Sequence, residues 1–469
     1  MSDPATWLKK LLEANSGSIP LARIPLFEQF AGDERNIKVI QEIFGDQQLL
    51  MERWKLHSRI SDIKEQALSI PNAKAGVPYD ALIDFEKLGW SDVISCNITG
   101  LEETGLAYDA AQHRISGIPE VSGNIKLVLH FRLASEADDT ALNEKAINLV
   151  INPDPKSLWK EISTDPNALY GKEDTVHLSG RLGDKNIVAA SKRGRSHANT
   201  GAFREDDFAC RYYEATGWSI VAVADGAGSA RLSREGSRIA CQTVLDYFSV
   251  HLATEAFIAF DELIAAHYSQ PGEAIAKKLN HLLYSHLGTA ALEVRKKLAE
   301  TAALSETDIR DFHTTLIFAL VRKYEFGYAI LSFGVGDCPI ALLSTDLSGV
   351  VIMNPIDAGD YGGGTRFITM PEIFQDERLG TRFGFQLVPD FAYLIMMTDG
   401  IYDPKFAVEA NLEKPEKWKE FLSDLQGNNE AKAAVDFTPD NPEAGVQLAA
   451  WMDFWSPGNH DDRTLVILY

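Results

Sequence analysis

The chain has 469 residues, 45% of them hydrophobic, and a formal net charge of -22 from 67 acidic and 45 basic residues. This length exceeds one ordinary domain and predicts two or three domains with real cores. The acidic balance repels nucleic acid and anionic lipid, so proteins that bind either are disfavoured. The four cysteines form no CxxC pair, which favours the reducing cytoplasm over a disulfide framework or a zinc site.

Residues 1–75 are predicted to form a helical segment. The stretch WLKKLLEA and the longer stretch over residues 36–68 place apolar residues at helical spacing, and breakers from Pro71 to Gly76 end the pattern. The charged N-terminus lacks the apolar core of a secretion signal. No apolar run approaches the roughly 20 residues of a membrane helix, so no membrane contact is expected.

Residues 76–155 change to short alternating runs such as NIKLVLHFRL and AINLVINP, which is typical of an all-β module. Residues 105–123 read GLAYDAAQHRISGIPEVSG. This stretch resembles the "GLxYDxxxxxISGxPxxxG" signature of putative immunoglobulin, cadherin-like modules. The resemblance implies a small Ig-like β-sandwich that contacts protein. Residues 156–184 are expected to be a polar linker, so a chain shortened at about residue 180 should keep its activity.

Residues 185–469 alternate strongly apolar strands with helices, which predicts a mixed α/β domain. The predicted strands are WSIVAVADG, TTLIFALV, GYAILSFGVGD, FAYLIMMTDG and RTLVILY. The predicted helices are SREGSRIACQTVLDYF, EAIAKKLNHLLYSHL and NPEAGVQLAAWMDFW.

Aspartates recur at the ends of these strands. Asp225, Asp337 and Asp399 each follow an apolar run, and Asp461 and Asp462 stand before the last strand. A single Asp-Gly pair is more often a turn, but several buried carboxylates together repel one another unless divalent cations neutralise them. The joint pattern therefore predicts a cation site, and its oxygen ligands suit Mg²⁺ or Mn²⁺ rather than zinc.

The order of the motifs resembles the protein phosphatase type 2C (PPM) family, in its bacterial branch. The matching blocks are SKRGRSHANTGAFREDDFA, VAVADGAGSARLSREGSRIA, HTTLIFALV, FGVGDCPIALL, LIMMTDGIYD and HDDRTLVILY. The resemblance implies an αββα sandwich of two mainly antiparallel sheets flanked by helices over residues 185–469. It also implies a metal-dependent phosphatase for phosphoserine and phosphothreonine, with a phosphoprotein substrate and a cognate Ser/Thr kinase as partners.

The same resemblance implies roles for single residues. Two ions, Mn²⁺ or Mg²⁺, would share a bridging hydroxide that attacks phosphorus directly, and a third, weaker ion would lie near Asp337. The catalytic positions are Asp225, Asp399 and Asp461. The metal-binding positions are Asp225, Gly226, Asp399, Asp461, Asp206, Glu205 and Asp337, of which Glu205 and Asp206 would act mostly through water.

Two positions depart from the family pattern. Gly201 stands where a phosphate-binding arginine is usual, and Ala227 stands where some members carry a proton-donating histidine. The candidates to bind phosphate are Arg193, Arg204 and His197. The candidates to donate the proton are His197, His313 and His460. These departures keep open a second hypothesis, a catalytically weak or inactive scaffold that binds metal and phosphoprotein.

A nucleotide-binding enzyme is a further alternative, because Gly226 and Gly228 lie between a predicted strand and a predicted helix. Arg231 stands where a dinucleotide fingerprint needs its third glycine, and there is no Walker GK[ST], which disfavours it. The glycine-rich residues 356–374 match the region that forms a flap beside the active site in the family. A surface loop without a role is an equal alternative for this segment.

Overall fold

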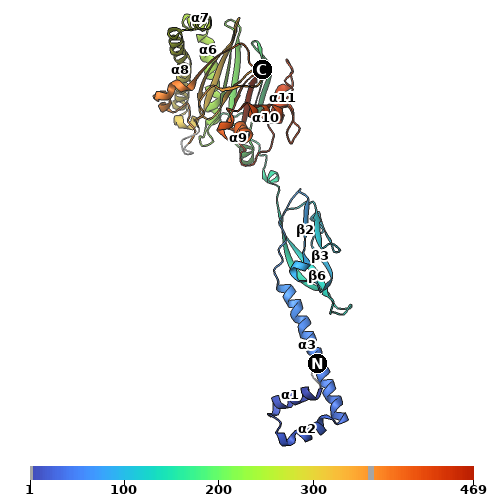
Figure 1. Cartoon of the computed structure of the whole chain (residues 1–469). Coiled ribbons are helices and arrows are strands. Elements are labelled where there is room, and N and C mark those ends of the chain that lie inside the picture. The colour runs from blue at the N-terminus through green and yellow to red at the C-terminus, as the bar shows by residue number, and fades with distance from the viewer. Residues whose placement is uncertain (1–3, 358–363) are drawn as a thin grey trace. The chain divides into compact units, whose positions relative to one another are not determined.

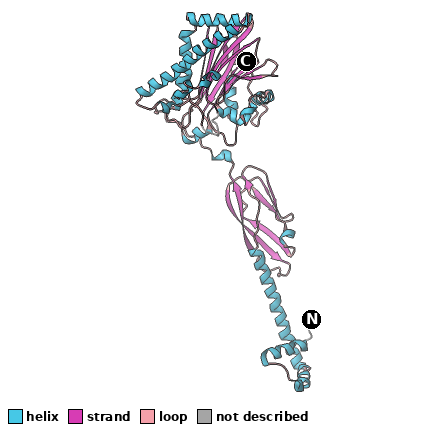
Figure 2. Ribbon diagram, turned by 60° about the vertical axis from the view of Figure 1, so that its left-hand side comes forward, coloured by secondary structure: helices cyan, strands magenta, loops and turns pink. Residues whose placement is uncertain are grey.

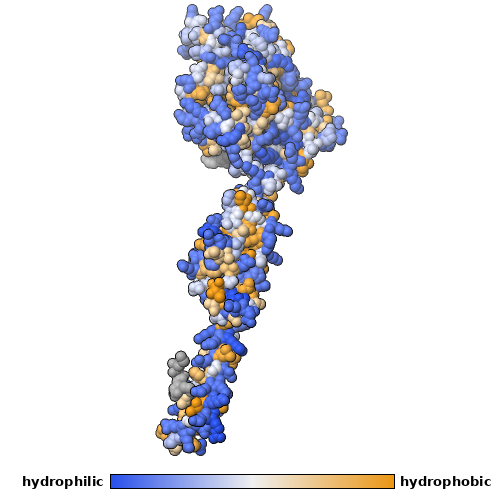
Figure 3. Space-filling model, turned by 90° about the vertical axis from the view of Figure 1, so that its right-hand side faces the viewer, coloured by the Kyte–Doolittle hydropathy of each residue, from blue (hydrophilic) through white to orange (hydrophobic). Residues whose placement is uncertain are grey.

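The computed structural model describes residues 4–357 and 364–469, and the chain divides into two compact units, Met1–Leu158 and Trp159–Tyr469 (Figure 1). Within the described ranges, no helix combines the length and the apolar character needed to cross a membrane. The face of the chain drawn in Figure 3 is mainly hydrophilic, with scattered apolar patches, which agrees with the high charge.

The N-terminal unit begins with helices α1 (Pro4–Ser16), α2 (Ile24–Ala31) and α3 (Glu34–Glu65). Asp33 caps α3, because its side chain accepts a hydrogen bond from the backbone N–H of Arg35. Leu8, Ala31 and Ile40 form a small core between these helices.

The rest of this unit is a β module with two sheets, ordered β1-β7-β6-β3 and β2-β5-β4. Side chains of both sheets, including Ile115 and Phe131, share one core. Lys145 donates hydrogen bonds to the carbonyls of Lys64 and Gln66, which ties the end of α3 to the module. The Ig-like character of the module stays a prediction. Its elements are β1 (Ala73–Lys74), β2 (Tyr79–Leu82), α4 (Phe85–Leu88), β3 (Val93–Thr99), β4 (Leu106–Asp109), β5 (Arg114–Gly117), β6 (Gly123–Leu133) and β7 (Asn143–Asn152).

Two antiparallel sheets form the centre of the described C-terminal unit (Figure 2). One is ordered β10-β11-β12-β13-β16 and the other β15-β14-β17-β18-β9-β8, and their facing side chains, such as Val221 and Val466, share one core. The strands are β8 (Thr175–Leu182), β9 (Lys185–Lys192), β10 (Asp207–Tyr213), β11 (Trp218–Ala224), β12 (Leu316–Tyr324), β13 (Gly327–Val335), β14 (Ile340–Leu343), β15 (Val350–Ile352), β16 (Phe383–Val388), β17 (Tyr393–Met397) and β18 (Arg463–Leu468).

Helices cover the outer face of each sheet, which completes an αββα arrangement and confirms the mixed α/β prediction (Figure 1). One layer holds α6 (Ser233–His251), α7 (Glu255–Ser269) and α8 (Glu273–Leu304). The other holds α9 (Asp399–Phe406), α10 (Pro415–Leu425) and α11 (Ala444–Trp451). Fully buried phenylalanines, for example Phe248 on α6 and Phe318 on β12, fill the first of these outer cores.

The stretch 156–184 differs from the linker that its composition suggests. Residues from Trp159 onward belong to the C-terminal unit. The strand β8 lies inside this stretch and pairs with β9 along its whole length, from Thr175 opposite Lys192 to Leu182 opposite Lys185. The alternation in TVHLSGRL is the strand signal that polar composition obscured.

A candidate metal centre

The acids of the strand-end pattern lie at one common edge of the two sheets. Since β11, β12 and β13 are antiparallel neighbours, Ala224 at the end of β11 and Val335 at the end of β13 both lie beside the start of β12. In the other sheet the end of β17 lies beside the start of β18, where Met397 pairs with Leu465. The strand ends next to Asp225, Asp337, Asp399 and Asp461 therefore adjoin one another.

Asp225 and Asp399 are the most perturbed carboxyls of this edge. Withdrawal from water raises the pKa of each carboxyl well above its usual range, and the negative charge of Asp399 raises that of Asp225 further. Asp461, Asp337 and Asp206 add to the repulsion on both. Glu205 joins the same group through Asp461, whose charge raises its pKa. The structure thus brings the predicted acids into a single cluster, hereafter the acid cluster: Asp225, Asp399, Asp461, Asp337, Asp206 and Glu205.

Two compact donor groups can be distinguished among the described residues. Donor atoms of Asp225, Asp337 and Cys338 lie within 4.8 Å of one another, and so do donor atoms of His197, Asp461 and Asp462. Burial raises the pKa of the Cys338 thiol well above its usual range, so it stays protonated and is a poor ligand. The remaining donors of the first group are carboxylate oxygens.

Backbone hydrogen bonds fix the position of Asp225. Its carbonyl accepts bonds of 2.8 Å from the Thr314 hydroxyl and from the Thr315 N–H, while its own N–H donates to the Thr315 hydroxyl. A side chain at Gly226 would place its Cβ 2.7 Å from the Glu205 carbonyl oxygen. Glycine is therefore required there by the close approach of the two backbones.

Threonines hold the carboxylate of Asp206. Its Oδ2 accepts hydrogen bonds of 2.7 Å from the Thr398 hydroxyl and 2.8 Å from the Thr464 hydroxyl. Burial, followed by the charge of Asp462, raises the pKa of Asp206 to about 7 despite these bonds. Burial likewise raises the pKa of the neighbouring Glu205 to about 7.

His197 faces the acid cluster through Asp462 and Glu205. Its Nδ1 lies 3.0 Å from Oδ1 of Asp462, and its Nε2 lies 3.7 Å from Oε2 of Glu205. Burial by itself lowers the pKa of His197, but the surrounding carboxylates outweigh it and raise the value to about 9. His197 is therefore a cation at neutral pH.

The other two candidate histidines have different surroundings. Nδ1 of His313 lies 2.5 Å from the Thr369 hydroxyl, and its ring stacks on Phe367. His460 lies against the rings of Trp159 and Trp455. Burial lowers the pKa of both, so they are neutral at physiological pH.

The structure argues against a phosphate contact by Arg193 or Arg204. Arg204 is 1% exposed, and it donates to the Ser191 hydroxyl and to the carbonyls of Glu173 and Asp206. Arg193, also buried, donates to the carbonyls of Ala202 and Ile162 and pairs with Asp174. Both arginines brace the chain around the acid cluster, which their sequence context did not reveal.

Lys172 is a further supporting residue that the sequence did not indicate. Its Nζ lies 2.7 Å from the Asp206 carbonyl, 3.1 Å from the Ser237 hydroxyl and 2.9 Å from a carboxylate oxygen of Asp207. Thr398 and Thr464 were also missed, although each adjoins an acid-bearing motif in the sequence. Lys172 carried no signal, because it lies in the stretch interpreted as a linker.

A family model described as "Protein phosphatase 2C" matches residues 193–451, more than half of the chain. The chain belongs to the protein phosphatase 2C family. It is accordingly a metal-dependent phosphoprotein phosphatase. No curated protein matches the chain.

Solved structures of phosphatases share similarity with the chain at low identity. The serine/threonine phosphatase Stp1 from Staphylococcus aureus is 13% identical with a TM-score of 0.35, and the match covers 64% of this chain and 98% of that one. The catalytic domain of the phosphatase PstP, in complex with two manganese ions, is 18% identical with a TM-score of 0.34, covering 61% and 97%. The phosphatase 2C from Toxoplasma gondii is 11% identical with a TM-score of 0.35, covering 63% and 98%.

The acid cluster of this phosphatase 2C chain fits divalent cations. Oδ2 of Asp337 accepts a 2.6 Å hydrogen bond from the Thr365 hydroxyl, but Oδ1 is buried without a hydrogen-bond partner among the described residues. Burial and the charges of the surrounding acids keep Asp225 and Asp399 protonated unless a positive charge offsets them. Hard oxygen donors in such a set suit Mg²⁺ or Mn²⁺. Of the predicted flap, residues 358–363 lie outside the described residues.

Proposed function

We propose that this chain hydrolyses phosphoserine and phosphothreonine monoesters in proteins with two divalent cations, Mn²⁺ or Mg²⁺, held by the acid cluster. The observation that carries the proposal is the gathering of Asp225, Asp399 and the neighbouring acids at one sheet edge, where burial and the surrounding negative charges raise the pKa values of both carboxyls. Such repulsion costs stability, and catalysis is a reason to retain it.

Each acid has a role in this proposal. Asp225 and the Gly226 carbonyl would hold one ion, Asp225 with Asp399 and Asp461 would hold the second, and Asp337 would serve a third, weaker ion. Bound cations supply the Lewis acidity that activates water and neutralises the phosphoryl charge. Glu205 and Asp206 would orient water in the outer shell. The hydroxyls of Thr398 and Thr314 donate to Asp206 and to the Asp225 carbonyl, and so fix the positions of these two residues.

His197 is the best placed of the three candidate histidines to hold the proton that the leaving oxygen requires. It is protonated at neutral pH, and its Nε2 faces Glu205 in the acid cluster. Its charge also makes it the remaining candidate to attract the phosphate, because Arg193 and Arg204 donate to protein groups.

A second candidate function is a weak or inactive scaffold that binds metal and phosphoprotein. Gly201, where the family usually has a phosphate-binding arginine, ends α5 (Arg195–Thr200) with φ of 76°. That left-handed conformation favours glycine, so an arginine there would be strained. The chain thus lacks this arginine for a backbone reason, which is the observation that favours the scaffold.

One assay separates the two functions. The full chain is tested with Mn²⁺ on p-nitrophenyl phosphate and on a phosphothreonine peptide, alongside the variants Asp225→Asn and Asp399→Asn and the exposed control Glu214→Gln. Turnover that both cluster variants reduce by at least roughly a hundredfold supports the phosphatase. Mn²⁺ binding by calorimetry without turnover on any phosphoester supports the scaffold.

We further propose that the β module contacts a protein, either the phosphoprotein substrate or a cognate kinase, in the cytoplasm. The signature over residues 105–123 supports the contact, and four unpaired cysteines support a reducing compartment. Cross-linking of the full chain in its native cells, compared with a chain that begins at Trp159, tests this. Partners that both chains capture equally would contradict the proposal.

A further inference from the structure

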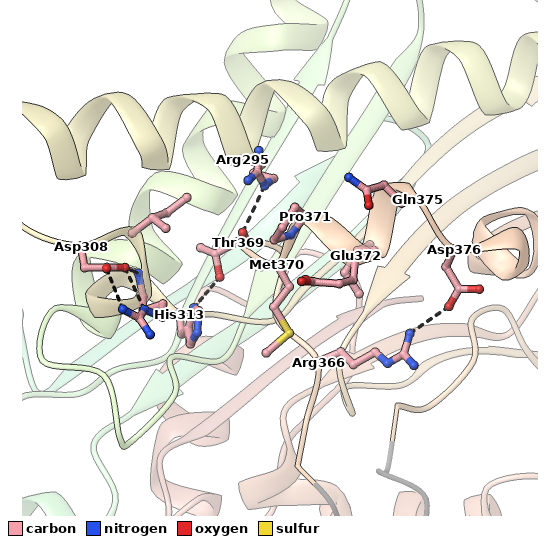
Figure 4. Close-up of a pocket in the computed structure, with 13 residues that line it drawn as sticks. Arg295, Asp308, His313, Arg366, Thr369, Met370, Pro371, Glu372, Gln375 and Asp376 are labelled. Carbon is pink, nitrogen blue, oxygen red and sulfur yellow. Dashed lines mark hydrogen bonds and ion pairs between the residues drawn. The ribbon is translucent and has the colours of Figure 1, made fainter.

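A pocket of about 900 Å³ opens between α8, the 3₁₀ helix η3 (Ile309–Phe312) and the segment that leads into the 3₁₀ helix η5 (Pro371–Phe374) (Figure 4). Met370 and Pro371 are among its lining residues, and Arg295 reaches it from α8. The proposed reaction does not use this space, hereafter the Arg295 pocket.

The Arg295 pocket adjoins the acid cluster along two separate chain segments. His313 in its wall precedes Thr314, whose hydroxyl donates to the Asp225 carbonyl. Arg366 in its wall follows Thr365, whose hydroxyl donates to Asp337. In each case one residue and one hydrogen bond lie between the pocket wall and the acid cluster. The distance from the pocket wall to the acid cluster is therefore on the order of 10 Å. An extended peptide spans that distance in about three residues.

The charges of the pocket leave one arginine without a carboxylate. Arg310 pairs with Asp308, and Arg366 pairs with Asp376. Arg295 donates from Nε to the Thr369 carbonyl at 3.1 Å, and its terminal nitrogens meet no carboxylate among the described residues. These nitrogens offer the fork that binds a carboxylate in a bidentate manner.

Two further groups face the same space. Glu372 also lines the pocket, is exposed and has no ion pair among the described residues, so its negative charge opposes the binding of an acidic group. His313 is neutral and adds no charge. The chain as a whole is acidic at -22, so attraction of an acidic substrate has to come from short-range contacts such as that of Arg295.

We propose that the Arg295 pocket receives an acidic side chain of the phosphoprotein substrate, about three residues from the phosphorylated residue, with Arg295 as its carboxylate partner. The inference rests on the proposed phosphatase function and specifies its substrate class. The aliphatic part of a glutamate lies against Met370, and its carboxylate meets the guanidinium of Arg295. Arg295 is therefore a specificity-determining residue and not a catalytic one.

The test uses the full chain with Mn²⁺ and phosphothreonine peptides in which one glutamate, or glutamine in the matched peptide, is moved along either side of the phosphoresidue. The expected ratio of kcat/KM between the Glu and Gln peptides is roughly tenfold at one position, since hydrogen bonds to charged groups are worth about 1.5–3 kcal/mol. Arg295→Gln brings this ratio close to one. Glu372→Gln raises it about twofold. Lys296→Gln, one residue away on α8 and exposed, leaves it unchanged.

A ratio near one at every position, or a ratio that Arg295→Gln leaves intact, overturns the inference. Inorganic phosphate that binds through Arg295 without any glutamate preference would make the pocket a small-anion site and also overturn it. If the wild type hydrolyses no phosphoester, including p-nitrophenyl phosphate, the proposed function fails separately. Fluorescence anisotropy of the labelled peptides then decides the inference alone, by whether the Glu peptide binds more tightly and loses that advantage in Arg295→Gln.

Discussion

Nδ1 of His197 lies 3.0 Å from Oδ1 of Asp462, and the ion pair joins chain segments that are far apart in sequence. The same carboxylate accepts hydrogen bonds from the N–H groups of Gly194, at 2.6 Å, and Glu205, at 2.5 Å. The negative charge of Asp462 is matched by the protonated His197. The pair aligns the segment that carries Glu205 with the segment that carries Asp461.

Asp462→Asn should therefore destabilise the chain. In Asp462 each carboxylate oxygen accepts from one backbone N–H, whereas the NH₂ group of asparagine cannot accept a hydrogen bond. The substitution also leaves the His197 cation without its carboxylate. Breaking a buried ion pair by removing one partner costs about 3–5 kcal/mol. Urea unfolding of the metal-free chain measures the loss, with the exposed Glu214→Gln as the control. An unchanged midpoint would show that the pair is dispensable.

The Asp225→Asn and Asp399→Asn variants should move stability and activity in opposite directions. Each removes a carboxyl whose ionised form is disfavoured by burial and by the neighbouring acids, so the metal-free chain should become more stable. Each also removes a proposed cation ligand. Thermal unfolding in EDTA and in Mn²⁺ tests both effects, because a cation at 100 times its Kd adds about 2.7 kcal/mol to the wild type. Variants that lose stability in EDTA would contradict the repulsion.

Glu205 and Asp206 contribute to the pH dependence of the metal-free chain. Both have pKa values of about 7 in the folded chain, against ordinary values of 4.5 and 3.8. The folded chain then binds more protons than the unfolded chain, so the stability that these groups contribute is present at low pH and falls as the pH rises from about 4 to about 7. Carboxylates with lowered pKa values, such as Asp376 at about 2, titrate below this window.

Mn²⁺ should reverse that trend. The cation competes with protons for the same carboxylates, so the increase in unfolding temperature that it produces should grow as the pH rises through this window. Differential scanning fluorimetry between about pH 5 and pH 8, with EDTA or Mn²⁺, measures the increment. An increment independent of pH would show that the cluster carboxylates are already ionised without the cation.

The acid cluster could be predicted from the sequence because apolar strands end in aspartate, and antiparallel neighbours place such ends side by side. Asp225, Asp399 and Asp461 required no more than that pattern and the order of the motifs. The roles of Arg193 and Arg204 could not be predicted in this way. An arginine next to a site has the same local sequence whether its guanidinium faces solvent or donates to backbone carbonyls, and only the fold around Ile162 and Glu173 decides which.

The boundary of the catalytic unit gives the sharpest contrast between composition and structure. Lys172 and β8 lie in the polar stretch 156–184, yet Lys172 bonds to the Asp206 carbonyl and β8 extends the six-stranded sheet. A chain that begins at Trp159 should fold and keep turnover of p-nitrophenyl phosphate. A chain that begins at Arg181 should lose it, because the Asp206 segment loses its lysine and β9 becomes an edge strand.

Lys172→Met in the full chain separates these two causes. Its Nζ lies 2.9 Å from Asp207, and both side chains are largely buried. The variant leaves β8 in place but reduces the ion pairs of Asp207 to the longer one with Arg204, at 3.8 Å, so it should destabilise the chain. Circular dichroism with the p-nitrophenyl phosphate assay gives the readout. If the chain that begins at Arg181 is folded and active, residues 159–180 are dispensable and the supporting role assigned to them is wrong, even if Lys172→Met is inactive.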